Sequence, residues 1–368
     1  MTKTAQASMG PSRGRSAINY LANLDILRSI AVLLVVIAHF TMYVRMYTQI
    51  GRFYLWTQWM GLAGVCLFFV HTCLVLMWSL ERDPHTGRFY IRRMFRLFPL
   101  WLVVLGLVVT LHVPVSPTAA PQFGYIKVGI PELLANASMT FNLGYGARIV
   151  GASWSLPIEA QMYLLLPLLF FFIRSTRALW VLLVIDGLAI ASVWTVYEIH
   201  GTPNAMLAMC IPYFLPGVMA YTLTKKVRPI LPAWSFIVFL LGMLAVDQRY
   251  GTLFHSCFIC LAVGLALPFF RQVSWRPAVR TSHLVARYSY GIYLCHIPSI
   301  CVGLYYLRGH SFALRLASIP IVLTISSVAL YHGIEAPMIR LGSRLAKKIE
   351  SGPSPKVNET TLSLEPAP

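Results

Sequence analysis

The sequence predicts an all-α, polytopic membrane protein with about ten transmembrane helices and with both the N- and C-termini in the cytoplasm. Three observations predict this class. Of the 368 residues, 57% are hydrophobic and only 11% are charged, and the mean hydropathy is +0.68, whereas about 25% of the residues in a soluble domain are charged. The apolar residues gather in runs long enough to cross a bilayer as helices. The basic residues fall mainly on one side of these runs.

Ten apolar runs follow one another along the chain. Their approximate limits are 24–44, 59–80, 97–113, 154–173, 178–196, 206–224, 232–247, 253–270, 288–307 and 315–334. We therefore expect a transmembrane domain over residues 21–348. The polar residues 1–20 predict a cytoplasmic tail, and residues 349–368, which lack apolar periodicity, predict a disordered cytoplasmic tail.

The lysines and arginines predict the orientation. With the N-terminus inside and ten spans, 23 of the 30 basic residues fall on the cytoplasmic side and seven on the other, as the positive-inside rule requires. Losing one span would invert every later loop and remove this asymmetry. We expect a multi-pass protein of the inner cell membrane, with the lipid bilayer as its surroundings and an oligomeric state that the sequence leaves open.

The net charge of +18 follows from this topology. A nucleic-acid partner would need a solvated basic face, and the chain has hardly any soluble domain to carry one, so we expect none. The seven cysteines lie in or beside apolar runs without the spacing of a zinc site. We expect them to pack in the helix bundle, and we expect no metal and no permanently bound cofactor.

The first apolar run carries ionisable residues at both ends. Asp25 and Arg28 lie near its cytoplasmic end and His39 near its outer end, and at ~100° per residue all three share one helix face. Ionisable groups inside a membrane span are by default candidates for a functional site. The alternative is a snorkelling Asp/Arg pair together with a core histidine.

The third run begins with the arginine-rich sequence RFYIRRMFRLFP, residues 88–99. Arg93 and Arg96 lie one turn apart on a shared face, and so do Arg92 and Arg96. Guanidinium groups bind phosphates in a bidentate manner. Together with Arg28, at the same depth, they predict a phosphate-binding cluster at the cytoplasmic side. The positive-inside rule alone would also place basic residues here.

The fourth run opens with SWSLPIEAQMYLLLP, residues 153–167. Glu159 should lie about 7.5 Å below the outer boundary, and His39 about 8 Å below it. A carboxylate beside a buried imidazole fixes its tautomer and supports proton abstraction, which makes His39 and Glu159 the candidate catalytic residues. The alternative is a structural carboxylate bonded to helix N-terminal amides.

Two further ionisable residues lie in the last third of the chain. His296, in YSYGIYLCHIP at residues 288–298, should fall near mid-bilayer. Glu335, in YHGIEAP at residues 331–337, should lie level with the arginines and order them. His71 is a further membrane histidine, for which we expect a packing or pore-lining role.

Six collinear motifs carry a resemblance to a known family. They are LDILRSIAVLLVVIAHF (24–40), GLAGVCLFFV (61–70), RRMFRLFP (92–99), SWSLPIEAQMYLLLP (153–167), YSYGIYLCHIP (288–298) and IEAP (334–337). Over nearly its whole length the chain resembles the acyltransferase-3 family of integral membrane acyltransferases, which modify cell-surface polysaccharides and related molecules. No long segment follows the last apolar run, so we expect the stand-alone form without a periplasmic esterase-like domain.

The resemblance implies ten core helices, an acyl-coenzyme A donor on the cytoplasmic side and an acceptor that is usually outside. It maps the family's functional residues onto Arg28, His39, Arg93, Arg96, Trp154, Ser155, Glu159 and Glu335. We expect Arg28, Arg93, Arg96 and Glu335 to hold the donor. Trp154 and Ser155 are assigned to substrate binding, together with Tyr163, Tyr293 and His296 from two of the same motifs.

The expected function is O-acyl transfer, first of all O-acetyl transfer, from acyl-CoA to a hydroxyl of a cell-surface or exported glycan or glycolipid. His39 would act as a general base on the acceptor or would take the acyl group covalently. The main alternative is a secondary transporter or flippase for an anionic lipid or sugar, since buried Arg, His and Glu also mark proton-coupled pathways. A third alternative is a scaffold without catalytic activity.

Overall fold

The computed structural model describes residues 13–48, 57, 59–113, 128–143, 148–173, 178–200, 207–250 and 253–349. Within these residues the chain is helical, and its one β-type contact is a single bridge between Leu231 and Phe270. Most of the two predicted tails lies outside the described residues. The first helix begins at Arg13, before the first predicted apolar run.

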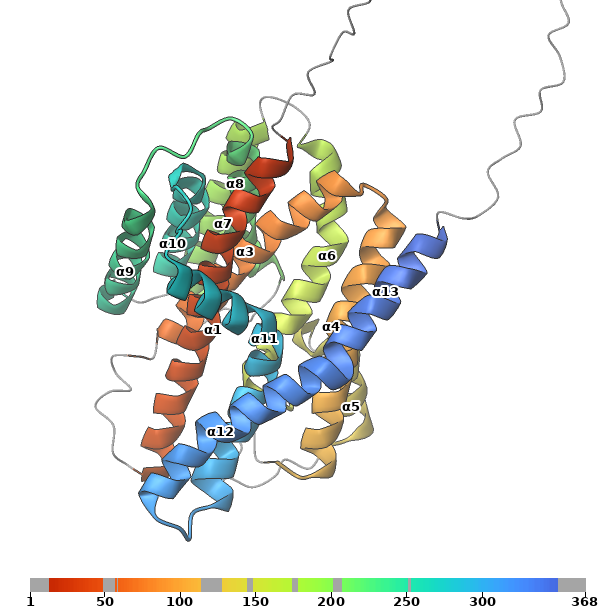
Figure 1. The fold of residues 1–368 in the computed structure, drawn as a ribbon, viewed down its shortest axis with the longest axis vertical. Coiled ribbons are helices and arrows are strands. Elements are labelled where there is room, and N and C mark those ends of the chain that lie inside the picture. Colours follow the sequence, from red (N-terminus) through yellow and green to blue (C-terminus); the bar gives the residue numbers. More distant parts are fainter. Residues whose placement is uncertain are drawn as a thin grey trace, which may run out of the picture.

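The long helices pack into one bundle (Figure 1). In chain order they are α1 (Arg13–Thr48), α3 (Met60–Arg82), α4 (Thr86–Thr110), α6 (Ser155–Phe172), α7 (Ala178–His200), α8 (Leu207–Thr224), α9 (Ala233–Tyr250), α10 (Leu253–Ala266), α11 (Arg276–Cys301), α12 (Phe312–Leu330) and α13 (Ala336–Lys348). The short elements are α5 (Ile130–Ala137), the 3₁₀ turns η1 (Phe141–Leu143), η2 (Gly151–Trp154) and η3 (Leu267–Phe269), and the π-helical turns η4 (Val302–Tyr306) and η5 (Tyr331–Glu335).

Six segments of the described chain are helices long and apolar enough to cross a membrane. They are Ala22–Met46, Met60–Arg82, Thr86–Thr110, Gly151–Phe172, Ala178–Val196 and Phe312–Lys348, and two shorter apolar helices are Ala233–Val246 and His255–Phe269. The helical class and the membrane location are thereby supported, while ten spans and cytoplasmic termini stay predictions. Helix α11 is not among the six, and its first half carries four charged or histidine side chains.

The outer surface of the bundle is apolar where lipid would lie. Leu164, Leu168 and Phe172 on α6 are 58–81% exposed, and Trp180 and Leu188 on α7 are equally open. In water so many exposed large apolar side chains would favour aggregation, whereas in a bilayer they contact acyl chains. These faces therefore mark the lipid boundary of the bundle.

Helix α3 lies at the centre of the bundle and packs against α1, α8 and α10. Two glycines allow these close contacts. A Cβ at Gly64 would lie 2.5 Å from the Ala31 carbonyl oxygen of α1, and one at Gly217 would lie 2.3 Å from the Val70 carbonyl oxygen of α3. Because α1 and α3 approach so closely, the polar residues on α1 are held at fixed positions beside those of α3.

Helices α12 and α13 form one long rod with η5 between them, and the rod crosses the outside of the bundle along α4 (Figure 1). Pro337 follows η5 directly, at the start of α13. A proline has no N–H to bond four residues back, so the wider π-helical turn before it accommodates the ring. This turn directs Glu335 into the protein, where it is buried.

Candidate active site

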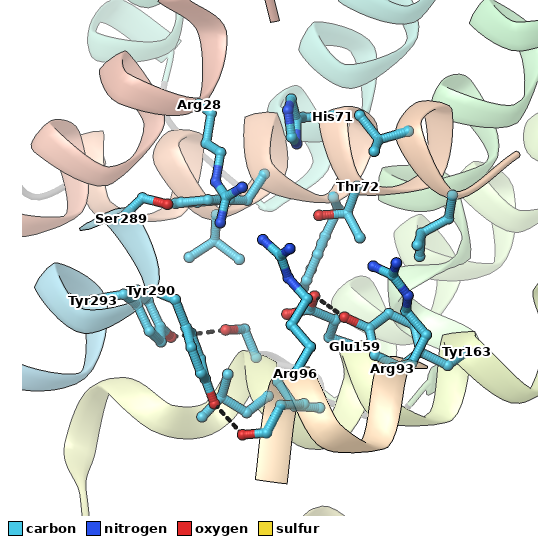
Figure 2. Close-up of a pocket in the computed structure, with 18 of the residues that line it drawn as sticks. Arg28, His71, Thr72, Arg93, Arg96, Glu159, Tyr163, Ser289, Tyr290 and Tyr293 are labelled. Carbon is cyan, nitrogen blue, oxygen red and sulfur yellow. Dashed lines mark hydrogen bonds between the residues drawn. The ribbon is translucent and has the colours of Figure 1, made fainter. Parts of the chain in front are cut away.

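A cavity of about 300 Å³ lies between α1, α3, α4, α6 and α11 (Figure 2). Each of these helices contributes polar side chains to its wall. They are Arg28 from α1, His71 and Thr72 from α3, Arg93 and Arg96 from α4, Glu159 and Tyr163 from α6, and Ser289, Tyr290 and Tyr293 from α11. Arginines that are far apart in the sequence therefore meet in one place, as their predicted depths require.

The lining of this cavity is strongly positive. Four arginines line it, the fourth being Arg82, against the single carboxylate of Glu159. The Nε atoms of Arg28 and Arg93 are buried without a hydrogen-bond partner. Buried charges of one sign repel one another and lose their hydration, so such a cluster is stabilised by an anion. This lining favours a negatively charged ligand over a neutral or positively charged one.

Glu159 lies in this arginine cavity. Its carboxylate accepts a hydrogen bond from the Tyr163 hydroxyl (Figure 2), and it interacts electrostatically with Arg28 and Arg93. The depth argument had paired it with His39. The structure places it instead in the lining of the arginine cavity, where its negative charge lies among the arginines, and its catalytic role stays a prediction.

Glu335 is buried behind the same cluster. It interacts electrostatically with Arg96 and Arg28, and its Oε2 has no hydrogen-bond partner. This placement agrees with the predicted ordering of the arginines. Asp25, in contrast, does not hold Arg28: its carboxylate contacts His283 of α11 at 2.8 Å.

Arg92 is separated from Arg93 and Arg96. It binds Asp83, in the turn between α3 and α4, at 2.7 Å, and Arg88 binds the same carboxylate at 3.0 Å. Partial burial disfavours the Asp83 charge, but the hydrogen bonds from Arg92 and from the His85 backbone outweigh it and lower its pKa. Arg92 thus belongs to a surface ion-pair network outside the cavity.

His39 lies in a second, smaller cavity of about 160 Å³. Its other lining residues include Trp154 of η2, Ala152, Met42 and Tyr293. The His39 Nδ1 is 2.9 Å from the Val35 carbonyl oxygen. Because a carbonyl only accepts, this bond assigns the proton to Nδ1 and leaves Nε2 as the basic nitrogen.

Tyr293 and Val65 line both cavities and form the wall between them. The Tyr293 hydroxyl donates to the Ala152 carbonyl oxygen and therefore accepts from Ser155 Oγ, 2.8 Å away. These bonds tie α11 to η2 and to the start of α6. Tyr293 and Ser155 are thereby structural supports of the wall as well as lining residues.

His296, one turn beyond Tyr293, has its ring centroid 5.0 Å from that of His39. It is 1% exposed. The two histidines predicted from separate motifs therefore lie side by side, with His39 lining the smaller cavity and His296 buried against it. Of the substrate-binding candidates, Trp154 lines the cavity of His39, and His296 is buried beside His39 without lining it. Tyr163 and Ser155 line the arginine cavity, and Tyr293 lines both cavities.

Sequence reasoning missed several lining residues. Tyr290 and Ser289 line the arginine cavity from α11, and the Tyr290 hydroxyl donates to the Leu97 carbonyl oxygen at 2.6 Å. Tyr290 lies three residues before Tyr293, so helical spacing could have revealed it. His71 lines this cavity with an unpartnered Nδ1, which agrees with a pore-lining position. Among the described residues no group of three or more His, Cys, Asp or Glu could hold a metal ion.

The comparison with known families identifies the fold that carries these two cavities. A family model described as an acyltransferase domain, acyltransferase-3, matches residues 21–332. The chain belongs to the acyltransferase-3 family. Both cavities, with His39, the arginines, Glu159 and His296, fall inside the matched residues, and Glu335 lies just beyond them.

Curated relatives of this acyltransferase-3 chain include two O-acetyltransferases. It is 23% identical to the O-acetyltransferase OatA of Staphylococcus aureus, over 88% of this chain and 58% of the relative. It is 25% identical to the peptidoglycan O-acetyltransferase OatA of Listeria monocytogenes, over 78% of this chain and 50% of the relative. The chain thus spans about half the length of these relatives.

A third relative of this acyltransferase-3 chain is matched over a shorter segment. It is the acyltransferase MdmB of Streptomyces mycarofaciens, which is 30% identical over 36% of this chain and 35% of the relative. No solved structure matches this chain. The family favours an enzyme over a transporter or a scaffold.

Proposed function

We propose that this protein is a membrane O-acyltransferase that moves an acyl group, first of all an acetyl group, from cytoplasmic acyl-CoA to a hydroxyl of a cell-surface or exported glycan or glycolipid. The acyl-CoA is a donor substrate, and no cofactor stays bound. The names of the OatA relatives make peptidoglycan the first acceptor to test. The proposal includes ten spans in the inner membrane with both termini in the cytoplasm.

The single observation that carries this proposal is the relation between the two cavities. The arginine cavity offers guanidinium groups to phosphates, and the adjoining cavity offers the basic Nε2 of His39 to a hydroxyl. Only the side chains of Tyr293 and Val65 are common to both linings. A donor held by its phosphates in the first cavity would extend its pantetheine arm past these two residues towards His39.

The proposed chemistry begins at the acceptor hydroxyl. As its oxygen attacks the thioester carbonyl, His39 Nε2 takes the hydroxyl proton, a C–O bond forms and the C–S bond breaks. The proton then passes to the leaving thiolate and gives free coenzyme A. In the covalent alternative His39 Nε2 would first attack the thioester itself, and an acyl-histidine trapped by acid quenching would distinguish that route.

The experiment uses purified full-length protein with labelled acetyl-CoA and peptidoglycan glycan fragments. His39→Ala should abolish acetyl transfer while acetyl-CoA still protects the variant against thermal unfolding, because the phosphate site is separate. Near-normal turnover of His39→Ala would contradict the assigned chemistry. Failure of acetyl-CoA to protect the wild-type protein would instead favour the transporter alternative.

A further inference from the structure

His39 lines the smaller cavity, and a second imidazole, that of the buried His296, lies against it, although general-base catalysis needs only one. The rings of His39 and His296 are tilted by 58° with their centroids 5.0 Å apart. They come from different helices, α1 and α11, which pack along each other. Their juxtaposition is therefore a property of the tertiary fold.

Both imidazoles are held in the same tautomer. His296 Nδ1 lies 2.6 Å from the Tyr293 carbonyl oxygen, just as His39 Nδ1 lies 2.9 Å from that of Val35. Each carbonyl only accepts, so each Nδ1 carries the proton and each Nε2 keeps a lone pair. The His39–His296 pair thus has two basic nitrogens and no imidazole N–H that is free to donate.

His296 Nε2 is fully buried and has no hydrogen-bond partner. A buried acceptor without a donor destabilises a protein by about 1–3 kcal/mol. The unpaired nitrogen is explained if its donor is present only during the reaction.

No carboxylate of the described residues interacts with His39. Glu159 is bonded to Tyr163 in the arginine cavity. Among the described residues, Arg148, in the segment before η2, interacts electrostatically with His39. The ring of Tyr293 lies beside that of His296. Arg148 is a cation and Tyr293 is a neutral phenol. An imidazolium formed on His39 would therefore have no carboxylate among the described residues to stabilise it.

We propose that His296 is a positioning residue that shares the proton taken up by His39. When His39 Nε2 takes the proton of the acceptor hydroxyl, the imidazolium N–H donates to His296 Nε2, so the charge is spread over two rings. Two protons on the pair would place two cations side by side in an apolar wall, so the pair holds one at a time. This inference rests on the proposed function.

The test compares two amide replacements of His296. An asparagine nitrogen can take the place of Nδ1 and keep the bond to the Tyr293 carbonyl, but it offers nothing at the position of Nε2. A glutamine places an amide oxygen near that position but loses the Nδ1 bond. The two variants therefore test separately the proton sharing by His296 Nε2 and the structural hydrogen bond of His296 Nδ1. Cys295→Ala, the neighbouring buried position on α11, is the control for packing.

The measurement is kcat and KM for acetyl-CoA across pH, with labelled acetyl-CoA and peptidoglycan glycan fragments. His296→Asn should lower kcat about 100-fold with an unchanged KM. Its acid limb should move to lower pH, because His39 binds a proton less tightly without an acceptor for the imidazolium N–H. His296→Gln should retain more activity than His296→Asn, and Cys295→Ala should keep the wild-type profile.

Proton sharing would be overturned if His296→Asn kept the wild-type rate and pH profile. In that case the role of His296 would be only its structural hydrogen bond to the Tyr293 carbonyl oxygen. If a thermal-unfolding measurement shows that His296→Asn does not fold, the acid limb of the His296→Gln pH profile decides. An amide oxygen accepts a hydrogen bond but takes up no proton at these pH values, so proton sharing predicts a shifted acid limb in His296→Gln and an unshifted limb would overturn it. If acetyl transfer is lost in His39→Ala but normal in both His296 variants, the role of His296 is refuted and the proposed function stands. A wild-type protein that neither binds nor uses acetyl-CoA overturns the proposed function as well.

Discussion

Glutamine substitution at neighbouring arginines of α4 gives a matched test of donor binding. Arg93 and Arg96 line the arginine cavity, whereas Arg92, next to Arg93 in sequence, is held by Asp83 at 2.7 Å outside it. All three changes remove one positive charge from the same helix. Only Arg93→Gln and Arg96→Gln remove it from the cavity.

The expected magnitude follows from the contact that is lost. A hydrogen bond to a charged group contributes about 1.5–3 kcal/mol, so each cavity variant should raise the Kd for acetyl-CoA about 10- to 100-fold. Arg92→Gln loses only a partly exposed ion pair, for which about 0–1 kcal/mol is typical. Its Kd should change by less than about 5-fold.

The assay is calorimetric titration of purified protein with acetyl-CoA, and in parallel with free coenzyme A. Both ligands should lose the same factor, because the arginines are assigned to the phosphates and not to the acyl group. An unchanged Kd in Arg93→Gln and Arg96→Gln, or an equal loss in Arg92→Gln, would refute the phosphate assignment.

Three further predictions concern the scaffold. Tyr293→Phe leaves the Ala152 carbonyl without its donor and Ser155 without its acceptor, and thermal unfolding should show a loss of about 1–3 kcal/mol. Gly64→Ala, whose Cβ would lie 2.5 Å from the Ala31 carbonyl oxygen, should lose about 1–3 kcal/mol, while Gly106→Ala on α4, with no atom within 4 Å of its Cβ, should lose none. Because the pKa of Asp83 is lowered in the folded protein, its ionised form stabilises the turn above the ordinary pKa, and that stability is lost as pH falls through the lowered value. Asp83→Asn should therefore flatten the acid side of the curve of unfolding midpoint against pH, and an unaltered curve would contradict this reading.

The sequence predicted the convergence of the arginines because helical spacing and charge determine height in the membrane. Arg28, Arg93 and Arg96 were expected at one depth, and they meet in one cavity. Local signals likewise account for the short helix α5, Ile130–Ala137, which has Pro131 and Glu132 in its first turn. The depth of a residue in the membrane and the local tendency to form a helix both follow from the order of residues along the chain, so they can be predicted from the sequence.

The partners of Glu159 and Asp25 could not be predicted in the same way. Depth alone brought Glu159 level with His39, but the direction in which a helix face points depends on how helices pack. The structure turns Glu159 towards Tyr163 and the arginines, and Asp25 towards His283. The neighbour of His39 is His296, 257 residues away in the chain, and only the packing of α1 on α11 brings the two together.

Local geometry that departs from the α-helix also escaped prediction. A proline inside a helix commonly kinks or ends it. Pro337 does follow a change of helix type, the π-helical turn Tyr331–Glu335, whereas α11 continues through Pro298 to Cys301. A π-helical turn depends on which carbonyls the surrounding packing leaves available, so its position is not encoded in the residues of the turn alone.

The measurement that tests the central claim most directly is the sidedness of acyl transfer in proteoliposomes. Labelled acetyl-CoA is placed on the side of the arginine cavity and peptidoglycan glycan fragments on the side of His39, with the opposite arrangement as control. The account predicts label on the acceptor across the membrane in the wild-type protein and none in His39→Ala. Acetylation that occurs only when donor and acceptor share one side would contradict it.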